Sequence, residues 1–134
     1  MPIQDWTPSL SVGNAKLDEQ HLTLLEIGRH LLSLLEKKPP PDEEIYFVLK
    51  DFAGLSSQHD AEEEKILAEN ECPSLAEHKM AHEAARAVLD HLLQGASQNL
   101  LDKAVLARAI GEWKIHHISE CDLPLRKYMK AKSR

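Results

Sequence analysis

The sequence has few aromatic residues and no long apolar run. Aromatic side chains make up 4% of the 134 residues, whereas leucine and alanine are abundant, so the composition favours helices over sheets. No apolar run approaches the roughly 20 residues that span a bilayer. The first residues contain neither the basic segment nor the apolar segment of a signal peptide. We therefore expect a cytoplasmic protein that does not insert into membranes.

Cysteines and an excess of basic residues are also lacking. Only two cysteines occur, Cys72 and Cys121, far apart and outside any CxxC pattern, which indicates two reduced thiols. The formal net charge of -6 argues against binding to nucleic acid, whose phosphates require a face rich in Lys and Arg. With 43% hydrophobic and 28% charged residues, the chain is expected to form a single domain over residues 1–134.

Apolar residues recur at helical spacing in four segments. The spacing predicts helices over 18–37, 43–69 and 75–94, and a fourth from near residue 99 to beyond residue 120. Turn formers within residues 1–16 predict an irregular arm before the first helix. Because short connections between long helices favour antiparallel neighbours, we predict an all-α, up-down-up-down antiparallel four-helix bundle.

The predicted helix ends follow from known capping and breaking residues. Three consecutive prolines at 39–41 end the first helix, because proline lacks a backbone donor and holds the chain extended. Asp42 is the expected N-cap of the second helix and Ser74 that of the third. Gly95 is expected to end the third helix.

Each predicted helix carries side chains of metal-ligand type on its apolar face. Burying the Glu63 and Asp122 carboxylates without a cationic partner would cost several kcal/mol. None of the inward polar groups is a Lys or Arg that could neutralise them. Five imidazoles and two carboxylates exceed the four ligands of a structural zinc and suit two carboxylate-bridged transition-metal ions, which points to iron. The seven candidates are His21, His59, Glu63, His78, His82, His117 and Asp122.

The other three histidines do not share these apolar faces. His30 and His91 lie among polar residues and are predicted to be exposed. His116 competes with its neighbour His117 for the inward position. We choose His117 because it continues the apolar seam that contains Trp113.

Several further residues are candidates to support the site. Trp113 lies one turn before His117 and either covers the site or serves as a plain core aromatic. Gln20, Glu19 and Glu64 could hydrogen-bond to the imidazoles, although we expect the two glutamates to be exposed.

The spacing on the fourth helix is irregular for residues of one site. His117 and Asp122 are five residues apart, which separates their directions by about 140° on a regular α-helix. Pro124 cannot donate a hydrogen bond to the carbonyl of Glu120, and its ring crowds that carbonyl. We therefore predict a widened turn of π-helical type between His117 and Pro124.

These residues, in this order, resemble the hemerythrin family, in particular the single-domain bacterial hemerythrins. The resemblance covers almost the whole chain, and its motifs are LDEQH at 17–21, HDAEEE at 59–64, CPSLAEHKMAH at 72–82 and WKIHHISECD at 113–122. It implies that one iron is held by three histidines and the other by two, with two carboxylates bridging both. The implied sets are His78, His82 and His117; His21 and His59; and the bridging Glu63 and Asp122.

The resemblance implies an oxo- or hydroxo-bridged diiron centre whose two-histidine iron has an open position for dioxygen. The implied function is reversible oxygen binding for storage, delivery or sensing. In delivery, a redox or oxygen-consuming protein would be the partner, and we expect a monomer or weak oligomer. The alternative is an enzyme that uses the same position, a diiron peroxidase or a scavenger of nitric oxide or peroxide.

The chain departs from the family at several positions. Asp60 stands where the family commonly has Phe, Cys72 where it has Tyr, and Lys114 where it has Leu. Leu25 and Gly28 stand where it usually has an aromatic and a bulky aliphatic residue. No ligand is lost, but Leu25 and Gly28 predict a roomier or wetter pocket beside the two-histidine iron.

Overall fold

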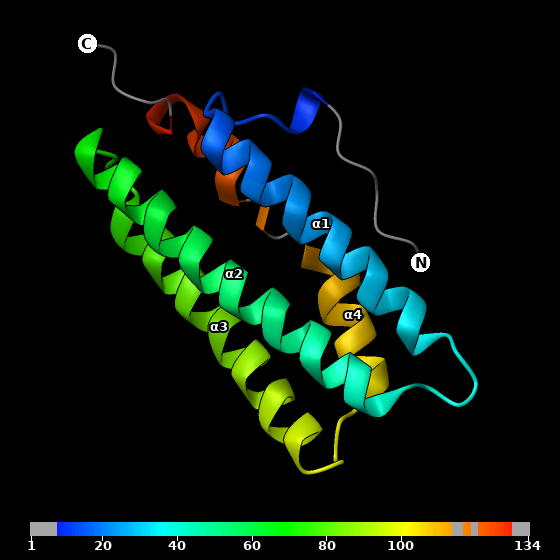
Figure 1. The fold of residues 1–134 in the computed structure, drawn as a ribbon. Coiled ribbons are helices and arrows are strands. Elements are labelled where there is room, and N and C mark those ends of the chain that lie inside the picture. The colour runs from blue at the N-terminus through cyan, green and yellow to red at the C-terminus, as the bar shows by residue number, and fades with distance from the viewer. Residues whose placement is uncertain (1–7, 114–116, 119–120, 130–134) are drawn as a thin grey trace.

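The computed structural model describes residues 8–113, 117–118 and 121–129 of the chain. In Figure 1, successive long helices run in opposite directions, with α1 packed against α2 and α4, and α2 against α3. The predicted all-α four-helix bundle is confirmed. None of the helices in the described ranges is long and apolar enough to cross a membrane. The long helices are α1 (Ala15–Leu35), α2 (Asp42–Glu69), α3 (Leu75–Ser97) and α4 (Lys103–Trp113), and short 3-10 helices cover Pro8–Leu10 and Leu123–Tyr128.

The first two helices begin at residues other than those predicted. Helix α1 begins at Ala15 rather than residue 18 because Asn14 caps it, its side-chain oxygen accepting from the Lys16 and Leu17 amides at 3.1 and 3.2 Å. Asp42 is not the N-cap of α2, since Pro41 occupies that position and Asp42 begins the helix. The Asp42 carboxylate instead pairs with Lys103 of α4 at 3.1 Å.

The connection between α3 and α4 also differs from the prediction. Gly95 does not end α3, which continues to Ser97. Asn99 takes the left-handed backbone conformation after the helix, with φ 56°, a place that asparagine tolerates better than most residues. Helix α4 begins at Lys103, later than predicted, where the Asp102 side chain accepts from the Val105 amide at 3.1 Å.

The core consists of two apolar clusters with a polar layer between them. The larger cluster includes Leu24, Phe52, Leu89 and Ile118, and the smaller includes Leu17, Leu67, Cys72 and Met129. Along α1, α2 and α3, and along the segment that contains Asp122, the predicted metal-binding residues fall between members of the two clusters. The fold therefore gathers these polar groups at one level of the bundle. Cys72 is buried in the smaller cluster, and Cys121 is partly buried.

Helix α3 is less buried than its apolar stripe predicts. Its buried residues are His78, His82, Leu89 and Leu92. Ala85, predicted to face the core, is exposed. The reason is that α3 packs on α2, while its face towards α4 borders a pocket.

Candidate metal centre

The seven residues predicted to bind metal all lie buried in the polar layer. His21, His59, Glu63 and Asp122 are 0% exposed, and His117, the most exposed of the seven, is 8% exposed. Within the described part of the chain, the ion-pair partners of Glu63 and Asp122 are all histidines. His30 and His91 are exposed, as predicted.

The segment after α4 brings His117 and Asp122 to the same side. Residues 117–118 and 121–122 are π-helical, which confirms the predicted widened turn at the described positions. His117 Nε2 lies 3.0 Å from Asp122 Oδ2 as a result. His116, the competitor of His117, and Lys114 lie outside the described residues.

The two carboxylates lie between two groups of imidazoles. Each carboxylate directs one of its oxygens towards the first group and its other oxygen towards the second. Glu63 Oε1 contacts Nε2 of His78 and of His82, the latter at 3.1 Å, and Glu63 Oε2 lies 3.1 Å from His59 Nε2. Asp122 Oδ1 lies 3.1 Å from His78 Nε2, and Asp122 Oδ2 lies 2.8 Å from His21 Nε2. The layer therefore contains two adjacent places for a cation that share both carboxylates.

The ligand atoms form overlapping groups, and within each group all the atoms lie within 4.8 Å of one another. One group contains His21, His59 and His117 with both carboxylates, and a second contains His78 and His82 with both carboxylates. His117 Nε2 lies 3.0 Å from His59 Nε2, and His117 also forms a third group with Asp60 and His82. His117 thus lies with His21 and His59 and also near His82, and its assignment to the His78 and His82 ion stays a prediction.

Hydrogen bonds at the outer ring nitrogens orient two of the imidazoles. His59 Nδ1 lies 2.7 Å from Gln20 Oε1, and His82 Nδ1 lies 2.7 Å from Glu64 Oε2. Because both partners accept, Nδ1 donates to them, and Nε2 is the nitrogen directed into the layer. Gln20 and Glu64 are therefore positioning residues, although we expected Glu64 to be exposed. Glu19 is exposed, as expected.

Several buried polar atoms of the layer have no hydrogen-bond partner. His21 Nε2 and Asp122 Oδ2 are 2.8 Å apart, yet neither makes a hydrogen bond. The same holds for Glu63 Oε2, Asp122 Oδ1 and Asp60 Oδ1. Buried acceptors without donors are costly, and cations between them would remove that cost. Imidazole nitrogens and carboxylate oxygens are a donor set that fits transition-metal ions.

The carboxylates and imidazoles change one another's protonation. Burial and the charge of Asp122 oppose ionisation of Glu63, but its contacts with His59, His78 and His82 lower its pKa to about 2. Burial also disfavours the imidazolium forms, yet the adjacent carboxylates of Asp122 and Glu63 raise the pKa of His59 to about 9 and of His78 to about 10. The metal-free layer therefore holds protons that bound cations would displace.

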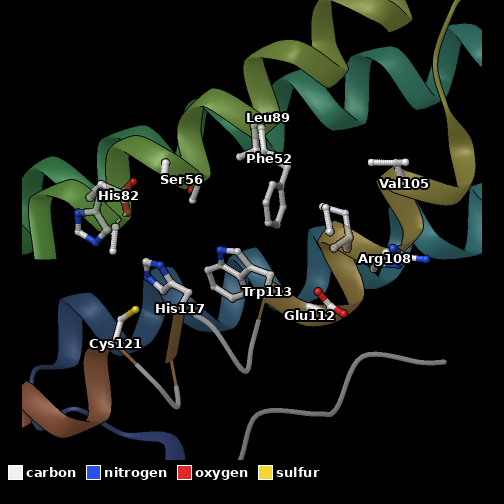
Figure 2. A pocket seen from close by; sticks show the side chains of 17 residues that line it. Phe52, Ser56, His82, Leu89, Val105, Arg108, Glu112, Trp113, His117 and Cys121 are labelled. Carbon is white, nitrogen blue, oxygen red and sulfur yellow. Dashed lines mark ion pairs between the residues drawn. The ribbon is translucent and has the colours of Figure 1, made fainter. Parts of the chain in front are cut away.

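A pocket of about 520 Å³ leads from the surface to the polar layer between α3 and α4 (Figure 2). Its inner end is formed by Asp60, His82 and His117. The Trp113 ring stacks on His117, with centroids 4.8 Å apart and planes 12° apart, and also packs edge-on against Phe52. Trp113 thus both covers the layer and belongs to the core. The apolar wall of the pocket includes Ala81, Ala84, Ala85 and Val88 of α3 and Val105 and Ala109 of α4.

The pocket lies away from the side that the sequence predicted to be roomy. Leu25 and Gly28 are buried in α1, and neither lines the pocket. The open space lies instead where alanines of α3 and α4 face each other, because a methyl group cannot fill the gap between the two helices. The alanine spacing at 81, 84 and 85 was the available sequence signal for this pocket. Asp60 was identified in the sequence as unusual, but not as part of the site.

Comparison with known proteins agrees with this geometry. The Hemerythrin HHE cation binding domain matches residues 12–124, a range that contains all seven residues of the cluster. Bacteriohemerythrins from two strains of Campylobacter jejuni, of serotypes O:6 and O:2, are each 24% identical to the chain over 125 residues, which is 92% of this chain and 92% of theirs. No solved structure is significantly similar to it.

Proposed function

The chain belongs to the hemerythrin family of cation-binding domains, and we propose that it is an oxygen-binding, non-heme diiron protein. The observation that carries this proposal is the arrangement of the two carboxylates, each of which points one oxygen towards one group of imidazoles and its other oxygen towards the second group. Carboxylates shared in this way are how helical bundles hold two metal ions side by side. We further propose that residues 1–134 act as one domain.

The proposed ligands are the seven residues predicted from the sequence. Following the family resemblance, His78, His82 and His117 would hold one iron and His21 and His59 the other, with Glu63 and Asp122 bridging. Two ferrous ions in these places would supply electrons and an open coordination position for a small ligand such as dioxygen.

The surrounding residues supply the conditions for reversible binding. Gln20 and Glu64 fix the rings of His59 and His82, so that each Nε2 keeps its direction with or without a bound ligand. The large apolar cluster, in which Leu24 and Leu25 are fully buried, excludes water from the α1 side. Exclusion of water limits proton delivery to the centre and favours release of the ligand unchanged.

One observation favours the enzymatic alternative as a second candidate. The pocket between α3 and α4 reaches the layer and has a volume in the range of small-molecule sites, about 300–1,000 Å³. A diiron peroxidase, or a scavenger of nitric oxide or peroxide, would need such an entry for its substrate or reductant. Oxygen binding and turnover require the same ligands, so kinetics must separate them.

Stopped-flow absorption tests the proposal directly. Iron-loaded, reduced protein is mixed with dioxygen, and the oxygen is then removed. We expect about two irons per chain and a spectrum that forms with oxygen and returns to its starting state on removal. One zinc per chain, or no metal after expression in iron-rich medium, would contradict the diiron assignment. Rapid turnover of peroxide with an added reductant would favour the enzyme.

A further inference from the structure

We propose that Asp60 is a further ligand of the metal centre, on the side that opens into the pocket between α3 and α4. The inference rests on the proposed function, because it concerns the same pair of ions. It adds a third carboxylate to a centre for which the family pattern supplies two. The evidence lies in the burial of Asp60, in its unpartnered oxygen and in the histidines that it faces.

Asp60 is placed at the edge of the cluster by its position on α2. It follows His59 directly, so its side chain points about 100° around the helix from that of His59, towards α3. Asp60 is 4% exposed. Its Oδ1 lies 3.5 Å from His82 Nε2, and Asp60, His82 and His117 offer three ligand atoms within 4.8 Å of one another.

The contact between Asp60 and His82 is not a hydrogen bond. Asp60 Oδ1 has no hydrogen-bond partner. His82 directs Nδ1 to Glu64 at 2.7 Å and Nε2 to Glu63 Oε1 at 3.1 Å, so both of its ring nitrogens already have other partners. A buried carboxylate oxygen without a donor is unfavourable unless a cation lies within its reach. A metal ion bound by His82 would supply the missing partner of Asp60 Oδ1.

Arg86 is the competing explanation for the buried carboxylate. Its guanidinium lies 3.8 Å from Asp60 Oδ2, and the Arg86 side chain is 40% exposed. This ion pair uses the other oxygen, is long, and lies towards solvent, where such pairs contribute little. It leaves Oδ1 without a partner, so Arg86 alone does not account for the position of Asp60. The pair would instead hold the carboxylate with Oδ1 directed at the histidines.

A ligand at this place has two measurable consequences. It changes the coordination of the bound metal, and it competes with small anions that reach the metal through the pocket. A negative charge near the pocket would also repel anions without touching the metal. A control must therefore remove one negative charge near the pocket but away from the cluster, and Glu112, which is exposed and lines the pocket, provides it.

The experiment compares Asp60→Asn with Glu112→Gln in the full chain. The visible d–d absorption of the Co²⁺-loaded protein reports the coordination of the metal, and azide titration of the ferric protein reports access to it. We expect Asp60→Asn to retain metal, to change the Co²⁺ bands and to tighten azide binding severalfold, because the anion gains a coordination position and loses a neighbouring negative charge. We expect Glu112→Gln to do none of these beyond a small change in azide affinity.

The possible results separate this inference from the proposed function. If Asp60→Asn binds two metals and matches Glu112→Gln in both measurements, Asp60 serves only the Arg86 pair and the inference is wrong. If the unaltered protein binds no pair of metals, the proposed function fails and the inference fails with it. Should Asp60→Asn not fold, Asp60→Glu displaces the carboxylate by one methylene group. A Co²⁺ spectrum identical to that of the unaltered protein would then also overturn the inference.

Discussion

The metal-binding layer is closed on its α1 side and open between α3 and α4, where the pocket lies. On the closed side, His21 and His59 are 0% exposed, and Leu24 and Leu25, about one turn after His21 on α1, are buried in the large apolar cluster. On the open side, His82 and His117 line a pocket of about 520 Å³ to which no residue of α1 contributes. The ligand types are the same on both sides, so the difference lies in the side chains around them.

The size of the neighbouring side chains decides which side is closed. Leu24 and Leu25 on α1 fill the space next to the layer, whereas Ala81 and Ala85 flank His82 on α3. A leucine buries roughly three more carbon atoms than an alanine, and interiors tolerate few voids larger than a water molecule. The closed side is thus suited to retaining metal in a dry environment, and the open side to admitting a ligand.

Replacing Glu63 with alanine should have the largest effect, because it removes the feature that both sides share. Glu63 directs one oxygen to each group of imidazoles, so its loss should release most of both metals. Glu62→Ala is the matched control, since Glu62 pairs with Lys16 at the surface at 3.0 Å. Metal analysis of both variants tests this, and a Glu63→Ala protein that keeps both metals would rule out bridging.

The positioning residues should matter on both sides, with a larger effect on the open one. Gln20→Leu on the closed side and Glu64→Leu on the open side should each weaken metal binding by about 10- to 100-fold. The Glu64 change should cost more, because hydrogen bonds to ionised acceptors are about twice as strong as neutral ones. Competition with a metal chelator measures both affinities. Glu19→Leu, at an exposed position, should have no effect, and an equal loss there would argue against specific positioning.

Filling the pocket should make the open side resemble the closed one. Ala85 lines the pocket about one turn after His82, so Ala85→Leu should slow the entry of azide or dioxygen severalfold while leaving metal content unchanged. Ala87→Leu is the control, since Ala87 is exposed on α3 and does not line the pocket. Stopped-flow mixing measures the entry rates. If entry is as fast in Ala85→Leu as in the control, ligands reach the centre by another route.

The smallest effect should be the dependence of stability on pH in the metal-free protein. The pKa of His59 is raised to about 9 and that of His78 to about 10. The stability that these imidazoliums contribute is therefore complete below about pH 6.5 and is lost as the pH rises through 9 to 10. Metal-loaded protein should lack this alkaline loss and instead weaken towards acid, where protons compete for the imidazoles. Melting temperatures of the metal-free and the metal-loaded protein across this pH range test the prediction. The same pH dependence in both forms would contradict it.

Much of the fold and the candidate cluster could be predicted because both depend on local regularity. Apolar spacing places His21 and His59 on faces that must be buried, whatever the exact helix ends. The widened turn before Pro124 followed from the geometry of a five-residue spacing and the missing donor of proline. The helix ends were less predictable, because Asn14, Asn99 and Asp102 act through backbone contacts that depend on the path of the chain.

The pocket and the position of Asp60 could not be predicted because they depend on how far apart two helices lie. The sequence indicates that Ala85 belongs to an apolar stripe, but it does not indicate whether α4 lies close enough to cover that stripe. Similarly, Asp60 is one position off the inward face of α2, and only the arrangement of α3 turns it towards His82. Tertiary spacing, rather than local pattern, determined both features.

Anomalous diffraction at the iron edge, from crystals of the iron-loaded protein, is the most direct test of the central claim. The account predicts two iron peaks in each chain, both in the polar layer, each next to one oxygen of Glu63 and one oxygen of Asp122. A single peak bound by four of the seven residues, or peaks that share neither carboxylate, would contradict it.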